Sequence, residues 1–126
     1  MKTLYALLAS PFAAHFPELY QELGIEVERF DSPRNLHRAL KDRLPDFFLG
    51  EFVYAWGNDY AGNTLSNLDV TLRTLQAKAP RAKVIVVMQP REAAHVDKLL
   101  EVFPVHAVLQ TPIAEDQMRA ALVGVE

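Results

Sequence analysis

The side chains best suited to catalysis or metal binding are few in this sequence and stand far apart. Cysteine is absent, which excludes disulfides, thiolate metal ligands and cysteine nucleophiles together. The histidines are scattered singly, and no serine lies in the glycine-flanked turn that an activated nucleophile needs. The residues concerned are His15, His37, His95, His106, Ser10, Ser32 and Ser66. We therefore expect no metal site, no catalytic triad and no enzyme, with the histidines on the surface or packed in the fold.

Phosphate binding by backbone amides also lacks its usual signal. The first apolar run is followed by Ser-Pro-Phe-Ala-Ala-His, and no glycine precedes Gly24. Dinucleotide-binding turns and P-loops need glycine there because the backbone must approach the phosphate closely. A flavin phosphate loop of serine, threonine and glycine is missing for the same reason. We expect no nucleotide or flavin cofactor.

A cluster of aromatic side chains is the least ordinary feature of the sequence. It comprises Phe52, Tyr54, Trp56 and Tyr60, within residues 52–63. The cluster has two open interpretations: its alternating members cover a neighbouring pocket, or they form a protein-binding patch, because tryptophan and tyrosine are enriched at interface hot spots. The alternation also allows the preceding strand to continue past Glu51.

A regular alternation of predicted strands and helices positions these residues. Apolar and alternating runs predict strands at residues 3–9, 25–30, 46–52, 83–88 and 106–110. Apolar spacings of three and four, bounded by proline and glycine, predict helices at residues 17–23, 33–44, 64–79, 90–103 and 114–123. The first helix starts at Pro17, or earlier at Ser10-Pro11 with a kink. Strands and helices in this order predict an α/β fold: a five-stranded parallel sheet with helices on both faces.

Two segments allow finer predictions. Residues 25–30 alternate apolar and charged side chains, which is typical of a strand at a sheet edge. In the second helix, Leu36, Leu40 and Leu44 recur every four residues and predict one apolar stripe.

Composition and charge set the class of protein. At 126 residues, 50% hydrophobic and 23% charged, the chain fits a single globular domain, residues 1–126. A formal net charge of −3 provides no basic surface for nucleic acid. The apolar residues 4–9 are too few for a signal peptide or a membrane span, so we expect a cytoplasmic protein that does not bind membranes.

Three segments together resemble a known family. Residues 45–51 read PDFFLGE, residues 83–88 read KVIVVM, and Thr111-Pro112 follows the last predicted strand. In this order and spacing they resemble the third strand, the fourth strand and the post-strand Lys-Pro of the receiver domain of bacterial two-component response regulators. The resemblance covers nearly the whole chain. It implies a (βα)5, flavodoxin-like fold with its site at the carboxyl ends of the strands.

The same resemblance implies that the family's reactive residues are replaced. Glu51 takes the position of the phosphorylated aspartate, and its longer side chain misplaces the oxygen for in-line attack. Leu8 and Ala9 stand where receivers have two acidic residues that hold Mg²⁺. Met88 and Thr111 replace the hydroxyl residue and the lysine that contact the phosphoryl group. Without this electrostatic stabilisation, the resemblance implies a pseudo-receiver with no phosphotransfer.

From these residues we expect a phosphorylation-independent protein-interaction or regulatory module in bacterial signal transduction. It would dock through residues 52–63, or through the face of the fourth and fifth helices, and a homodimer is one form of such docking. The charged residues of that face are of both signs: Arg91, Glu92, Asp97, Lys98, Glu101, Glu115, Asp116 and Arg119.

Two other functions stay open. The first is a small-molecule binder that reuses the emptied pocket at Ala9, Glu51, Met88 and Thr111, and the second is a genuine phospho-accepting regulator. Glu51 itself is either a permanent phosphomimic or a solvated or amide-bonded carboxylate at a strand end.

Overall fold

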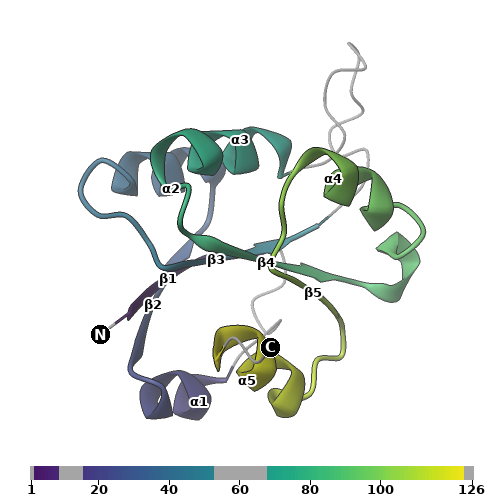
Figure 1. Ribbon diagram of the computed structural model, residues 1–126. Coiled ribbons are helices and arrows are strands. Elements are labelled where there is room, and N and C mark those ends of the chain that lie inside the picture. The colour runs from purple at the N-terminus through teal and green to yellow at the C-terminus, as the bar shows by residue number, and fades with distance from the viewer. Residues whose placement is uncertain (1, 9–15, 53–67, 124–126) are drawn as a thin grey trace.

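Parallel strands and helices alternate along the chain, as the sequence predicts (Figure 1). The computed structural model describes residues 2–8, 16–52 and 68–123. The strands are β1 (Lys2–Leu7), β2 (Ile25–Phe30), β3 (Phe47–Glu51), β4 (Lys83–Met88) and β5 (Ala107–Gln110). The helices are α1 (Pro17–Glu22), α2 (Pro33–Ala39), α3 (Asp69–Lys78), α4 (Val96–Val102) and α5 (Glu115–Val123). None of the helices in these ranges is long and apolar enough to cross a membrane.

The sheet has the strand order β2-β1-β3-β4-β5, and every neighbouring pair is parallel. Figure 1 shows α1 and α5 on one face of the sheet and α2, α3 and α4 on the other. This arrangement confirms the predicted fold class and the predicted edge position of β2. The order reverses between β1 and β3, and ligands of such sheets bind at the carboxyl ends of the strands near that reversal.

The core lies in two layers because side chains alternate between the two faces of each strand. Along β3, Phe48 packs with residues of α2, α3 and α4, whereas Phe47 and Leu49 pack with residues of α1 and α5. The strands β1, β3 and β4 are therefore buried on both faces, as their apolar runs predict.

Asp46, just before β3, joins three strands at their amino ends. Its carboxylate Oδ2 accepts a hydrogen bond from the Thr3 N–H at 2.8 Å, and its own N–H donates to the Thr3 carbonyl at 2.8 Å. The Asp46 carbonyl accepts from the Lys83 N–H at 2.9 Å. The Pro-Asp pair before the third strand thus helps to set the register of β1, β3 and β4.

Helix boundaries follow local sequence signals. Phe16 has a non-helical backbone and α1 begins at Pro17, which confirms the later of the two predicted starts. Gly24, after α1, has a φ of 70°, a conformation that glycine adopts without a Cβ penalty. Ser32 caps α2, since its Oγ accepts a hydrogen bond from the Asn35 N–H at 3.2 Å.

The predicted leucine stripe of the second helix is wrong at its last member. Leu36 and Leu40 are buried, but Leu44 is 52% exposed. The reason is that α2 ends at Ala39, so the helical repeat no longer places Leu44 on the buried face.

The predicted helix at residues 90–103 is divided. The N–H groups of Glu92 and Ala93 donate to carbonyls three residues earlier, which produces the short 3-10 helix η1 (Pro90–Glu92). The α-helix α4 starts only at Val96.

Gly50 has no room for a side chain. A Cβ there would lie 2.6 Å from Cε2 of Phe48 and 3.0 Å from Cδ2 of Leu68. The Phe48 ring therefore folds over the backbone of the residue that precedes Glu51, on the face of the sheet that α2, α3 and α4 cover.

Candidate functional site

Four of the five positions predicted for the degenerate phosphorylation site lie at the carboxyl ends of the strands. Leu8 follows β1, Glu51 ends β3 and Met88 ends β4. Thr111 follows β5, and its N–H donates to the Met88 carbonyl at 2.8 Å. The fifth position, Ala9, lies outside the described residues.

Glu51 is buried, with 4% of its surface exposed, and it has an interaction partner within the protein. Alternation along β3 places its side chain on the face of Phe47 and Leu49, toward α1 and α5. Of the alternatives for Glu51, the solvated carboxylate is therefore wrong, and the amide-bonded carboxylate and the phosphomimic stay predictions. An ionised carboxylate removed from water in this way needs such a partner, because its desolvation costs several kcal/mol.

Met88 belongs to the opposite side of the sheet from Glu51. It is buried in the apolar cluster that contains residues of α2, α3 and α4, whereas Leu8 packs against the cluster of α1 and α5. The side chains at the strand ends thus diverge toward two faces. The prediction of a pocket requires the side chains at these positions to converge, whereas strand alternation directs them to opposite faces of the sheet.

Phe52 is fully buried, so its place in an exposed aromatic patch is wrong. It follows Glu51, and alternation turns it into the cluster of Phe48. Its N–H donates to the Val87 carbonyl at 2.7 Å, which holds it against β4. The other three aromatic residues of the cluster, Tyr54, Trp56 and Tyr60, lie outside the described residues.

Two of the charged residues predicted for the face of the fourth and fifth helices do not belong to it. Glu92 is buried at 8% exposure, with Arg91 Nε 3.5 Å from its Oε2. Arg119 reaches from α5 to α1, where its Nη1 lies 2.6 Å from Oε2 of Glu22, and it also pairs with Glu115 at 3.3 Å. Arg119 therefore links the two helices on one face of the sheet and does not face toward α4.

Two histidines make contacts that stabilise the fold. Nε2 of His37 lies 3.0 Å from Oγ1 of Thr71, which connects α2 to α3, and burial lowers the pKa of His37. Nε2 of His106 lies 3.0 Å from the Ala121 carbonyl, which connects the start of β5 to α5. In the described ranges, His, Cys, Asp and Glu side chains form no group of three or more that could hold a metal ion.

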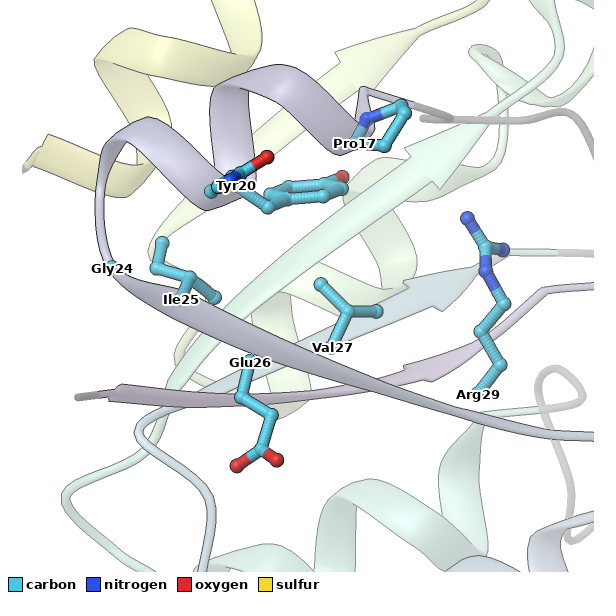
Figure 2. A pocket seen from close by; sticks show the side chains of 8 residues that line it. Pro17, Tyr20, Gly24, Ile25, Glu26, Val27 and Arg29 are labelled. Carbon is cyan, nitrogen blue, oxygen red and sulfur yellow. The ribbon is translucent and has the colours of Figure 1, made fainter.

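A hollow of about 430 Å³ lies elsewhere, between α1 and the edge strand β2 (Figure 2). Figure 2 shows Ile25, Val27 and Arg29 on the same side of β2, beneath Tyr20 of α1, while Glu26 points to the other side. The hollow is lined by residues of the six-residue helix α1 and by residues of β2. Its walls are mainly apolar, which is typical of binding sites.

Two polar groups give the hollow its electrostatics. Burial raises the pKa of Tyr20 to about 12, although the nearby Arg29 acts in the opposite direction. The Tyr20 hydroxyl therefore stays neutral at physiological pH. Arg29 supplies the positive charge, and it also lines a second hollow of about 480 Å³ with Leu8, Asp31 and Asn35.

Sequence reasoning missed the hollow between α1 and β2. Strand alternation places Arg29 on the same face as Ile25 and Val27, so the sequence held part of the signal. The missing information was the length of α1, since the prolines at 11 and 17 allowed two different helix starts.

Comparison with solved structures identifies the fold. A response regulator receiver domain protein from Clostridium thermocellum superposes with a TM-score of 0.74 at 14% identity, covering 98% of this chain and 93% of that one. The signal receiver domain of a putative Luxo repressor protein from Vibrio parahaemolyticus gives 0.72 at 11% identity, covering 97% and 87%. This chain has the receiver fold. RcsB, in a structure of two dimers bound to two parallel DNAs, also shares the receiver fold, with a TM-score of 0.72 at 10% identity, covering 98% of this chain and 59% of RcsB.

At the level of sequence, no protein-family model and no curated protein matches this chain. At identities this low, a shared receiver fold establishes architecture and not activity.

Proposed function

We propose that this chain is a pseudo-receiver: a phosphorylation-independent module that regulates a protein partner by binding it, within bacterial signal transduction. The observation that carries the proposal is the burial of Glu51 at the end of β3. A phospho-acceptor must present a carboxylate oxygen in line with the phosphoryl donor. A buried glutamate that already has a partner does not present its oxygen in this way.

The neighbouring strand ends support the same proposal. Leu8 follows β1 and Met88 ends β4, and neither side chain offers the hard oxygen ligands that Mg²⁺ requires. Thr111 has no positive charge to stabilise a phosphoryl group. On this proposal the module carries out no phosphotransfer of its own.

Docking is proposed at the edge strand β5 and its flanking helices, in addition to residues 52–63. Leu100 and Val102 of α4 are 40% and 57% exposed, and Val123 of α5 is 54% exposed. Apolar side chains bordered by charged ones are typical of interfaces. The RcsB structure, with its dimers, supports a homodimer as one form of this docking.

Two measurements test the proposal together. Incubation with acetyl phosphate and Mg²⁺ should add no phosphoryl group to the intact mass, under conditions in which a known receiver is modified. Light scattering should find a dimer that Leu100→Glu dissociates and Glu51→Gln leaves intact. Addition of a phosphoryl group would refute phosphorylation independence, and a monomeric wild type would exclude docking to a second copy.

Dissociation of the dimer by Glu51→Gln would instead favour the phosphomimic interpretation, because that substitution removes only the charge.

A small-molecule binder is the second candidate function. The hollow lined by Leu8, Asp31 and Asn35 favours it, because this hollow adjoins the carboxyl end of β1, where the sequence predicts a ligand site. Thermal-shift measurements with a panel of polar metabolites would test it: a stabilising compound whose effect is lost in Asn35→Leu supports the binder. A genuine phospho-accepting regulator ranks third.

A further inference from the structure

Within the part of the chain that the structure describes, the outer edge of β2 has a defined set of backbone groups that pair with no other strand. The Lys2 N–H donates to the Gly24 carbonyl at 3.0 Å, so Gly24 faces β1. Successive residues of a parallel strand direct their N–H and C=O groups to alternate sides. Ile25, Val27 and Arg29 therefore direct theirs outward, away from β1, along the open edge of the sheet.

The side chains of these same three residues lie along the hollow beneath Tyr20 (Figure 2). Ile25 is buried, Val27 is partly buried, and Arg29 is exposed at the far end. One extended segment placed beside β2 would thus meet outward backbone groups, an apolar hollow and a positive charge in a single line.

The charges along β2 determine which segment fits. Among the described ranges, the side chain of Arg29 forms no hydrogen bond or ion pair, and the same holds for the side chain of Glu28 on the other face of the strand. Glu26 already pairs with Arg43, with Nη1 3.1 Å from Oε1. A partner strand can therefore gain an acidic side chain opposite Arg29 and a basic one opposite Glu28.

We propose that β2 binds an extended peptide segment of a partner protein as an additional strand of the sheet. The segment alternates an acidic and a large apolar side chain toward α1 with a basic side chain toward the α2 side. Main-chain hydrogen bonds to Ile25, Val27 and Arg29 hold the strand, and the hollow beneath Tyr20 selects the apolar residue.

A second copy of this chain does not fit the same edge. Two-fold symmetric antiparallel pairing must keep each face of the sheet continuous, so paired residues share a face. The two registers that pair most of β2 then place Glu26 opposite Glu28, or Glu28 opposite its own copy. Like charges directly opposite each other destabilise a strand pair.

The test uses synthetic peptides and backbone amide chemical shifts of the intact chain. The peptide Ser-Glu-Lys-Leu-Thr-Val-Ser, blocked at both ends, matches β2 in an antiparallel orientation, and its reversed sequence matches in a parallel one. One of the two should shift the amides of Ile25, Val27 and Arg29 in a saturable manner, while a scrambled peptide does not. Shifts located elsewhere, or none with either peptide, would overturn the proposal.

Two N-methylated peptides show whether the peptide binds as a strand. One peptide carries a methyl group on the backbone nitrogen of leucine and the other on that of the adjacent threonine, so the two have the same composition. If the peptide binds as a strand, only one of these two N–H groups faces β2. One methylated peptide should bind about tenfold more weakly or worse, and the other about as well as the parent. Equal binding by both would mean that the hollow takes the side chain without a strand, which contradicts the proposal.

Charge exchange identifies the role of Arg29. The Arg29→Glu variant should bind the parent peptide with lower affinity. It should bind a peptide that has lysine in place of glutamate with higher affinity than the parent peptide. A loss that the lysine peptide fails to reverse would refute the assignment of Arg29. Because Arg29 is exposed, circular dichroism should show the variant folded.

The inference names a partner chemistry for the proposed interaction module, but it does not depend on Glu51. If a phosphoryl group is taken up and the peptide still binds, only the pseudo-receiver proposal fails. If neither peptide binds and no phosphoryl group is taken up, only strand addition fails.

Discussion

Gly50 offers the sharpest test of how closely the end of β3 is packed. Substitution Gly50→Ala would place a Cβ 2.6 Å from Cε2 and 2.8 Å from Cζ of Phe48. Real Cβ atoms do not approach ring carbons this closely, so the ring or the strand must move. Overpacking of this kind costs about 1–3 kcal/mol, partly offset by about 0.4–1 kcal/mol from the stiffer unfolded chain. We expect a net loss of about 1–2 kcal/mol in the free energy of unfolding.

A double-mutant cycle separates this clash from other effects. Phe48→Leu removes the two ring atoms concerned, so Gly50→Ala should cost about 1 kcal/mol less in that background than in the wild type. Urea denaturation followed by circular dichroism measures all four proteins. Gly24→Ala is the matched control: no atom lies within 4 Å of its Cβ, so any cost comes from its φ of 70° and should not depend on Phe48. An equal cost of Gly50→Ala in both backgrounds would refute the packing argument.

Three further predictions concern titration and capping. Because burial raises the pKa of Tyr20 from 10 to about 12, its contribution to stability should be fully present below pH 10 and be lost as the pH rises through about 12. The loss should be roughly 2–3 kcal/mol, and Tyr20→Phe should abolish it in urea titrations. The lowered pKa of His37 has the opposite effect, so stability should decrease as the pH falls below 6.5. His37→Gln, which can still contact Thr71, should reduce the change in melting temperature across that pH range. Ser32→Ala removes the cap on the Asn35 N–H and should cost about 1 kcal/mol, and Ser32→Asp should restore it, as measured by thermal unfolding.

The sequence was most informative where local chemistry determines structure. The apolar run at residues 83–88 correctly predicted a strand, and the alternating run at residues 25–30 correctly predicted an edge strand. Pro17 and Gly24 marked helix ends correctly, because each acts through its own backbone.

Predictions from the sequence were less accurate where contacts between residues far apart in the chain determine the structure. Leu44 fitted a helical repeat, but α2 ended before it because the chain must turn toward β3. The pocket prediction grouped Glu51 and Met88 by their position at strand ends, whereas alternation across the sheet sends their side chains to different faces. The hollow at β2 depends on how far α1 extends over the strand, which no spacing in the sequence reveals.

The central claim is that the end of β3 does not accept a phosphoryl group, and one titration tests it most directly. Beryllofluoride with Mg²⁺ mimics the phosphoryl group of an active receiver, and backbone amide shifts report where it binds. The account predicts no saturable shifts at Glu51, Met88 or Thr111 beyond those from Mg²⁺ alone, while a known receiver responds under the same conditions. Saturable shifts centred on Glu51 would contradict it and restore the phospho-accepting interpretation.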